Sequence, residues 1–94
     1  MISVTQQNSE NKGQFTLLDD GKQIGLMTYS KAGKDKIIID HTEVDPAYKG
    51  QGMGEKLVYA GVEYARNENL KILPLCPFAK IIFAKNKEIQ DVRV

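Results

Sequence analysis

The sequence predicts an α+β domain built around a mixed sheet, and three observations carry this prediction. Strand-type segments separated by turn residues fill the chain up to residue 44. The hydrophobic spacing then changes to a helical period over residues 53–67. A short apolar segment and a second helical segment follow, so the order is mostly β and then β–α–β–α. With 94 residues the chain can form a modest core, and we expect residues 1–94 to make one domain.

Two successive hairpins are expected in the first half. Asp20-Gly21 lies between apolar flanks in GQFTLLDDGKQIGLMTYS, residues 13–30, and this dipeptide favours a tight hairpin turn. The polar turn KAGKDK then leads into KIIIDHTEV, residues 36–44. A short strand over residues 2–5 and a polar loop over residues 8–13 are expected before them. The result is an antiparallel meander.

The second half favours a parallel pairing. The apolar residues at helical spacing over residues 53–67 are Leu57, Ala60, Gly61, Tyr64 and Ala65. ENLKILPL, residues 68–75, is expected to be a buried strand, and a strand, crossover helix and strand predict parallel pairing. CPFAKIIFAK, residues 76–85, has proline at a favoured first helical position. The side chains expected to face the core from this helix are Phe78, Ile81, Ile82 and Phe83. The tail, residues 88–94, fits either a last strand or a loose end.

Composition argues against several classes of protein. The net charge of +1 creates no broad positive field, and no basic stripe is interleaved with aromatic residues, so nucleic acid is not an expected partner. No apolar run reaches the length of a membrane span, and the first residues lack the pattern of a signal peptide. One cysteine cannot form an internal disulfide, which favours the cytoplasm. One histidine with one cysteine does not predict a metal site.

The segment DPAYKGQGMGEKL, residues 45–57, places three glycines between a strand and a helix. Glycine lets the backbone turn tightly and lets a ligand approach closely. The first N–H groups of a helix have no partner within it, and the helix dipole adds partial positive charge there. The segment therefore favours a phosphate site, with Lys49 as an additional cation. The spacing matches neither the Rossmann nor the Walker pattern, so a plain tight turn remains the alternative.

At this point the residues carry a family resemblance. HTEVDPAYKGQGMGEKL, residues 41–57, resembles motif A of the GNAT acetyltransferase superfamily. The positions that match the motif are Val44, Pro46, Gln51, Gly52 and Gly54, with Lys49 where arginine is common. CPFAKIIFAKNKE, residues 76–88, is similar to a later GNAT segment. Cys76, Ala79, Phe83 and Lys85 take the places of its asparagine, alanine, tyrosine and lysine. The resemblance covers residues 37–88 and is strongest to short members that carry a cysteine before the last helix.

The resemblance implies binding of acetyl-CoA and acetyl transfer to a primary amine on a small molecule, a peptide or a protein lysine. It implies that the end of the strand, Thr42 to Val44, hydrogen-bonds the pantetheine arm. The backbone groups that would hold the pyrophosphate belong to Lys49, Gly50, Gln51, Gly52, Met53 and Gly54. Lys80 and Lys85 are placed to reach phosphates or the adenine edge, although such lysines are more often a solvated face. Tyr48 either covers the cofactor or caps the loop.

Three residues are candidates for the chemistry. The position of the usual tyrosine acid is Phe83, which has no proton to give, so the standard direct transfer is in doubt. Cys76 precedes Pro77 and should cap the helix, where a thiol has a lowered pKa. It could be acetylated, act as the missing acid or simply be a small buried side chain. His41 and Glu43 share a strand face roughly 7 Å apart and are candidate bases, or an incidental polar pair.

Two functions therefore remain open, beside a weaker third interpretation as a small structural adaptor whose glycines serve only a turn and which binds no cofactor. The first is an N-acetyltransferase whose acceptor side is exposed, because the chain has no room for the helices that larger members place between their first strands. The second is a CoA-binding module without efficient catalysis, which Phe83 favours. The expected partners are acetyl-CoA and an unidentified amine acceptor, and the expected oligomeric state is a monomer or a weak dimer.

Overall fold

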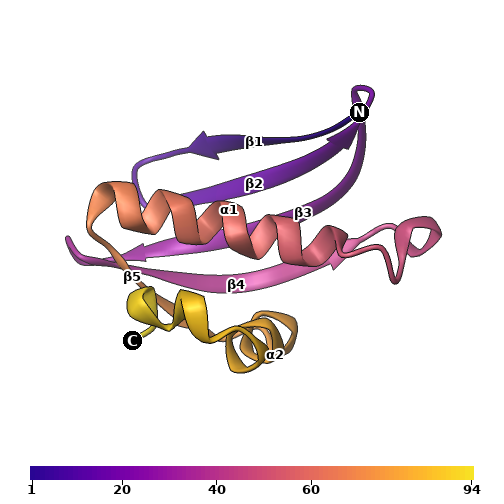
Figure 1. Ribbon diagram of the computed structural model, residues 1–94. Helices are drawn as coiled ribbons and strands as arrows, with labels where there is room; N and C mark the ends of the chain where they lie inside the picture. The colour runs from indigo at the N-terminus through magenta and orange to yellow at the C-terminus, as the bar shows by residue number, and fades with distance from the viewer.

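Five strands form one sheet in the order in which they occur in the sequence, as the computed structural model of residues 1–94 shows (Figure 1). The antiparallel strands are β1 (Ile2–Asn8), β2 (Lys12–Asp19), β3 (Lys22–Ala32) and β4 (Lys36–Val44). The last strand, β5 (Lys71–Pro74), lies parallel to β4. The predicted mixed sheet, antiparallel first and parallel late, is confirmed.

The first strand is longer than expected. β1 continues to Asn8 because every one of its residues is paired with β2, from Ile2 opposite Asp19 to Asn8 opposite Gly13. The predicted loop at residues 8–13 is correspondingly reduced to a short turn, which the backbone N–H of Ser9 closes by donating to the Lys12 carbonyl oxygen. The sequence predicted only the first part of this strand. Both faces of β1 are largely exposed and carry polar side chains, so the sequence shows little of the apolar alternation that indicates a strand.

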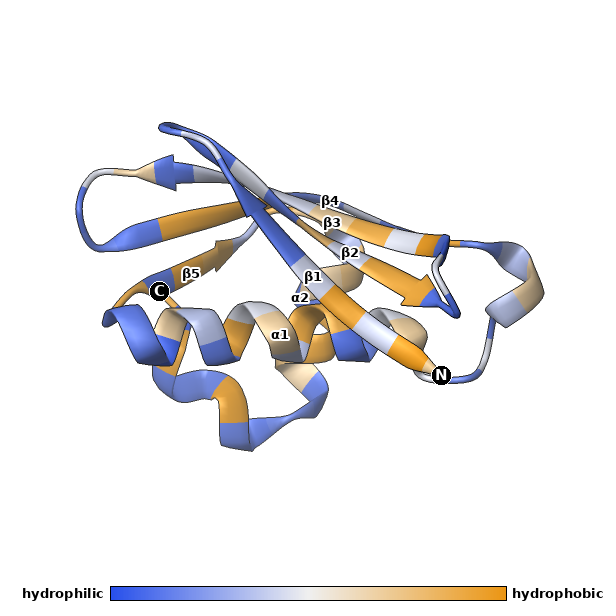
Figure 2. Ribbon diagram, turned by 90° about the horizontal axis from the view of Figure 1, so that it is seen from above, coloured by the Kyte–Doolittle hydropathy of each residue, from blue (hydrophilic) through white to orange (hydrophobic).

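Both helices, α1 (Met53–Glu68) and α2 (Pro77–Lys85), lie on the same side of the sheet, which makes the molecule a two-layer structure (Figure 2). Two 3₁₀ segments complete it, namely η1 (Pro46–Tyr48) before α1 and η2 (Lys87–Val92) after α2. The core between the layers is one cluster of 18 buried residues drawn from both helices and four strands. The other face of the sheet, here called the open face, has no helix over it.

The core-facing side of α1 differs in part from the prediction. Leu57, Gly61 and Ala65 are buried as expected, together with neighbours that the prediction omitted, among them Val58 and Val62. Ala60 and Tyr64 are only partly buried, because they line a groove between α1 and the edge strand β1.

The predicted core set of α2 is half wrong. Ile82 and Phe83 are buried, but Phe78 and Ile81 are 37% and 53% exposed. The reason is that Phe78 and Ile81 face the glycine loop across a groove and not the sheet.

The tail is neither a strand nor a loose end. Residues 87–92 form η2, after which Arg93 makes a single parallel bridge beside Ile72 of β5. Arg66 of α1 holds η2 in place by pairing with Asp91 at 2.8 Å and by donating to the Glu88 carbonyl oxygen.

Candidate functional site

The loop between β4 and α1 is held rigidly at its start. The Asp45 side chain accepts a hydrogen bond from the Ala47 N–H at 2.9 Å and so caps η1. The Tyr48 hydroxyl donates to Asp19 at 2.6 Å, which ties the loop to the turn between β2 and β3. This bond raises the pKa of Tyr48 and lowers that of the Asp19 carboxyl. Tyr48 therefore anchors the loop through its hydroxyl while its ring lines the groove beside it.

The glycines in this loop have a backbone requirement. Gly50 and Gly52 adopt φ values of 81° and 73°, in the left-handed region that side chains disfavour. Gly52 is the N-cap of α1 and offers no side chain to the first turn of the helix. Space in front of both residues is free, since a Cβ at either position would meet no atom within 4 Å. The loop thus exposes its backbone towards an open space.

Several backbone N–H groups at this point have no acceptor within the protein. They belong to Gly50, Gly52, Met53, Gly54 and Glu55. Those of Lys49 and Gln51 are used differently, because they close turns onto the carbonyl oxygens of Pro46 and Tyr48. Free N–H groups at the N-terminus of a 16-residue helix carry partial positive charge, which makes this segment a suitable anion cradle.

A groove of about 580 Å³ lies between this loop and α2. Gly54 forms its floor, and a Cβ there would overlap the ring of Phe78, so glycine permits the close approach of the two helices. Phe78 and Ile81 make the α2 side of the groove apolar, whereas Lys49 and Lys85 contribute positive charge. The groove therefore combines an apolar wall with an N–H-lined, cationic end. Lys80 does not line it.

The end of β4 is shaped by a β-bulge. Tyr29 of β3 lies opposite Ile39, and Thr28 lies opposite His41, so Asp40 is the extra residue. Because Thr42 pairs with the buried Met27, Thr42 and Val44 turn to the helical side. His41 and Glu43 turn to the open face.

β4 and β5 diverge immediately after Ile39, where their pairing ends. The N–H groups of Leu75 and Cys76 both donate to the Ile39 carbonyl oxygen, at 3.1 Å and 3.2 Å. Beyond this point no strand pairs with β4 on its β5 side. The Thr42 hydroxyl oxygen is buried near the divergence and makes no hydrogen bond of ordinary geometry, which leaves polar capacity for a ligand.

Cys76 caps α2, as predicted, and only 5% of its surface is exposed. Burial raises the pKa of the Cys76 thiol, but interactions with the backbone N–H groups of Ala79 and Phe78 and with Thr42 act in the opposite direction. Together they outweigh burial, so the pKa lies below its ordinary value. The thiol is thus sheltered and biased towards the thiolate, the nucleophilic form.

The remaining predicted residues fall on both sides of β4. His41 and Glu43 share a face, as expected, with Nε2 3.3 Å from Oε2, and both side chains are about 60% exposed. Phe83 is fully buried in the core, so it does not border the groove at all. The structure therefore brings the glycine loop, Val44 and Lys85 to one groove and places His41 with Glu43 on the opposite, open face.

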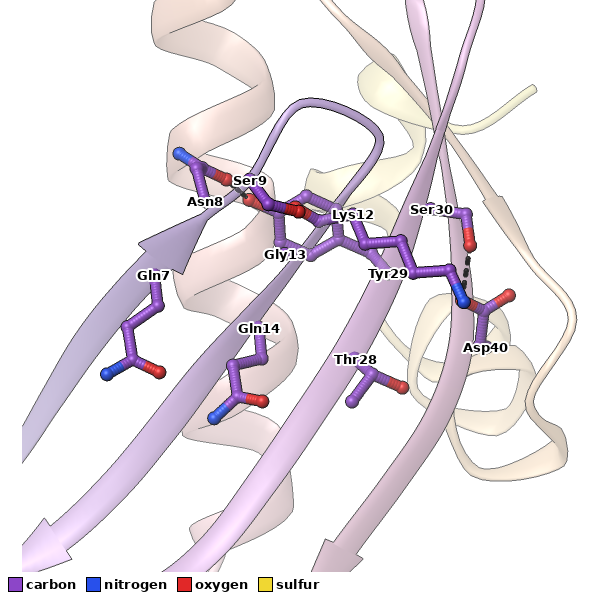
Figure 3. A pocket seen from close by; sticks show the side chains of 10 residues that line it. All are labelled: Gln7, Asn8, Ser9, Lys12, Gly13, Gln14, Thr28, Tyr29, Ser30 and Asp40. Carbon is purple, nitrogen blue, oxygen red and sulfur yellow. Dashed lines mark hydrogen bonds between the residues drawn. The ribbon is translucent and has the colours of Figure 1, made fainter.

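The open face has a hollow of its own, which sequence reasoning missed (Figure 3). It has a volume of about 630 Å³, and the side chains of Gln7, Gln14 and Thr28 project into it from three neighbouring strands. Ser30 donates to Asp40 at 2.7 Å at its edge. The hollow is broad, and Tyr29 is the only hydrophobic residue type among those that line it, which suits a solvated contact surface better than a pocket for a cofactor with an apolar arm. The signal in the sequence that could have indicated this hollow is the set of Gln, Thr and Ser residues that the alternation along the strands places on the open face.

Two further features bear on the class of site. Neither helix is long and apolar enough to cross a membrane. No three side chains of the types His, Cys, Asp and Glu gather in a way that could hold a metal ion.

The comparisons with known proteins agree with this geometry. The family described as GCN5-related N-acetyl-transferase matches residues 14–92, and the chain belongs to this family. A GCN5-like protein from Staphylococcus aureus, known from its NMR solution structure, is 40% identical with a TM-score of 0.73, covering 96% of this chain and 87% of that one.

More distant similarities define the fold alone. The ribosomal-protein-S18-alanine N-acetyltransferase from Escherichia coli is 17% identical with a TM-score of 0.71, covering 83% of this chain and 53% of that one. An acetyltransferase from Bacillus anthracis, solved in complex with acetyl coenzyme A, is 24% identical with a TM-score of 0.60, covering 69% of this chain and 38% of that one.

Protein NATD1 of Gallus gallus is 30% identical over 71 residues, which cover 74% of this chain but only 64% of the relative's own length.

Proposed function

We propose that this protein is an acetyl-CoA-dependent N-acetyltransferase. The observation that carries the proposal is the set of free backbone N–H groups at Gly50 and Gly52 to Glu55. They lie at the end of an apolar groove, where the space in front of Gly50 and Gly52 is open. A phosphate-bearing ligand with an apolar arm satisfies both halves of that site. The acetyl-CoA complex of a protein with the same fold supports the choice of ligand.

The residues present suit this ligand. The free N–H groups would hold the pyrophosphate, and Lys49 and Lys85 would add charge to its phosphates. After Ile39 the backbone of β4 has no strand on its β5 side, and its end, from Thr42 to Val44, would hydrogen-bond the amide groups of the pantetheine arm. The buried Thr42 hydroxyl supports this assignment, because it lies beside Cys76 and makes no hydrogen bond of ordinary geometry, so it keeps capacity to bond a ligand.

The bound thioester would supply an activated acetyl group, and this chain's residues would manage the protons. Cys76 stands at the divergence of β4 and β5, next to Thr42. As a thiolate it could attack the thioester carbonyl, forming Cys76 S-acetyl and releasing the CoA thiolate, and the amine would then regenerate the thiol. As a thiol it could instead protonate the leaving CoA thiolate during direct transfer. Phe83 can fill neither role because it is buried and has no proton to give.

His41 and Glu43 would serve an acceptor that approaches from the open face and meets the acetyl group where β4 and β5 diverge. Their side chains are 3.3 Å apart and exposed, so either could take the proton that the amine loses on acetylation. No helix covers this face, which favours a large acceptor such as a protein or peptide amine over a small molecule enclosed in a pocket (Figure 2).

Calorimetric titration with acetyl-CoA, and separately with CoA, tests the cofactor site. We expect saturable binding to one site per chain. Gly52→Asp places a carboxylate in the cradle and should weaken binding about tenfold relative to Gly52→Asn, which has the same shape without charge. Both side chains tolerate the left-handed backbone of Gly52. Gly21→Asp, in the turn between β2 and β3, controls for a new charge elsewhere and should bind normally.

Absence of binding at millimolar cofactor would overturn the proposal. Equal weakening by Gly52→Asp and Gly52→Asn would argue against an anion in the cradle.

Chromatographic detection of free CoA tests the transfer. With lysine-containing peptides present, the wild-type protein should release CoA, and Cys76→Ala should release it at least tenfold more slowly while binding acetyl-CoA as before. Small amines that react faster than every peptide would count against an open acceptor side.

A CoA-binding module is the second candidate, and the fully buried Phe83 at the position of the usual acid favours it. It predicts the same calorimetric result but no CoA release that depends on an amine.

A further inference from the structure

The outer strand β1 is an unusually unprotected sheet edge. Its seven residues, ISVTQQN, include no charged residue and no proline. The two irregularities of the antiparallel pairing lie between β2 and β3 and between β3 and β4, so β1 itself has no bulge. Charges, proline, bulges and short length are the usual devices that prevent an edge from pairing with another chain. β1 has none of them.

The hydrogen-bond phase of β1 determines which groups are free. The Asp20 N–H donates to the Met1 carbonyl oxygen, and the Ser9 N–H donates to that of Lys12. Since bonded and non-bonded pairs alternate in an antiparallel ladder, the odd-numbered residues of β1 bond to β2. The even-numbered residues therefore direct their N–H and C=O groups outwards, and these residues are Ile2, Val4, Gln6 and Asn8.

The opposite edge of the sheet is closed. β5 has only four residues, and its outer side is occupied by the end of the chain. The Val94 N–H donates to the Ile72 carbonyl oxygen at 2.9 Å, and the Lys71 ammonium donates to the Asp91 carbonyl oxygen at 2.6 Å. The molecule therefore has one usable edge. Pairing through a single edge closes after two copies, whereas two open edges would allow a filament.

We infer that β1 is a dimerisation strand that pairs antiparallel with β1 of a second copy of this chain. The register centred on Thr5 uses all four outward residues of each strand, with Ile2 opposite Asn8 and Val4 opposite Gln6 across the two-fold axis. A shift by two residues in either direction would leave one of them without a partner. The product is a ten-stranded sheet with one continuous open face.

An apolar groove beside β1 supports a second copy as the occupant. The groove has a volume of about 500 Å³, lies between β1 and α1, and is lined by Val4, Phe15, Ala60 and Tyr64 together with polar residues. Val4 points into it, because its partner across the ladder is the buried Leu17. In the Thr5-centred pairing, the Val4 side chains of both copies lie on this side next to the axis. The contact would therefore bury apolar surface as well as satisfy backbone groups.

Disulfide trapping tests both the dimer and its register. The Thr5 residues of the two copies would form a non-hydrogen-bonded pair, whose Cα atoms lie about 4.5 Å apart, within the range of a disulfide. In a Cys76→Ser background, Thr5→Cys should give a covalent dimer under mild oxidation. The matched control is Ser3→Cys, on the same strand and face, which would face Gln7 of the second copy and should remain monomeric.

Sedimentation equilibrium supplies the second measurement. The wild-type chain should show a reversible monomer–dimer equilibrium. Thr5→Lys, which brings two ammonium groups together, should weaken it at least tenfold, whereas Ser3→Lys should weaken it less. Val4→Pro removes one outward N–H from each copy and should also favour monomer, and circular dichroism checks that each variant is folded. A wild-type chain that stays monomeric at millimolar concentration, or a dimer unaffected by Thr5→Lys and Val4→Pro, would overturn the inference.

Discussion

At the scale of single residues, Gly54 and Phe78 show how one missing Cβ shapes the groove between the glycine loop and α2. Gly54 lies in the first turn of α1 and has ordinary helical geometry, so its glycine is not required by the backbone. It is required by the Phe78 ring, which occupies the space of a Cβ. The same ring is partly exposed and lines the groove.

We predict that the effect of Gly54→Ala depends on Phe78. In the wild-type chain the new methyl group meets the ring and should lower the free energy of unfolding by about 1 kcal/mol. In a Phe78→Ala background it should be neutral or stabilising, because alanine is the better helix former by up to about 1 kcal/mol. Urea denaturation of the four proteins measures this coupling. Equal effects in both backgrounds would contradict it.

At the scale of elements, η2 depends on polar contacts for its place against α1. Arg66 binds both the Asp91 carboxylate and the Glu88 carbonyl oxygen, and the Tyr59 hydroxyl donates to the Glu88 carboxylate at 2.7 Å. The hydrogen bond from Arg66 lowers the pKa of Asp91, and that from Tyr59 lowers the pKa of Glu88. These bonds join the end of the chain to the crossover helix. They also bring residues 93–94 beside β5, which closes that edge.

The Arg66–Asp91 pair should make stability depend on pH in a defined direction. Because folding lowers the pKa of Asp91, the pair stabilises the protein above the carboxyl's unfolded pKa and loses this effect as the pH falls through its folded pKa. Asp91→Asn should therefore lower the thermal midpoint near neutral pH, and the difference from wild type should shrink in acid. Asp35→Asn, whose side chain makes no ion pair, should show no such convergence. A constant difference across the pH range would contradict this account.

At the scale of the whole molecule, one core joins the two halves of the chain. Residues of the meander, of both helices and of η2 all contribute to the same buried cluster. Phe15 and Tyr29 belong to it, and the partly buried Tyr64 packs against them, so that rings from β2, β3 and α1 have centroids 5.5–6.1 Å apart. Neither half has a buried cluster of its own.

We therefore expect one cooperative unfolding transition. Tyrosine fluorescence reports on the aromatic cluster, and the chain has no tryptophan to obscure it. Its urea curve should superimpose on that from far-ultraviolet circular dichroism, with a slope of about 1 kcal/mol per molar urea. An N-terminal hairpin that melts before the helices would separate the two curves and contradict a single domain.

Much of the fold was predictable because short-range chemistry decides it. Asp20-Gly21 imposes a hairpin, the spacing of Leu57, Gly61 and Ala65 imposes a helix, and Pro77 after Cys76 starts another. The same local rules predicted the glycine loop and the helix that follows it, and they are the basis for proposing an anion cradle there. Where a prediction failed, as for Phe78 and Ile81, helical period alone could not say which of two apolar sides would meet the sheet and which would meet a neighbouring loop.

The sequence alone was enough to predict the order of the main elements and the mixed sheet, because both follow from neighbours along the chain. It also led us to expect an anion cradle in the glycine loop, which stays a prediction. Only the tertiary structure decided which side of β4 each candidate occupies. The bulge at Asp40 turns Thr42 inwards and His41 outwards, and the divergence after Ile39 places Cys76 beside Thr42. The tertiary structure likewise decided that the sheet edge at β5 is covered while the edge at β1 is free. The covering depends on residues 93–94 meeting Ile72, some twenty positions away in the chain.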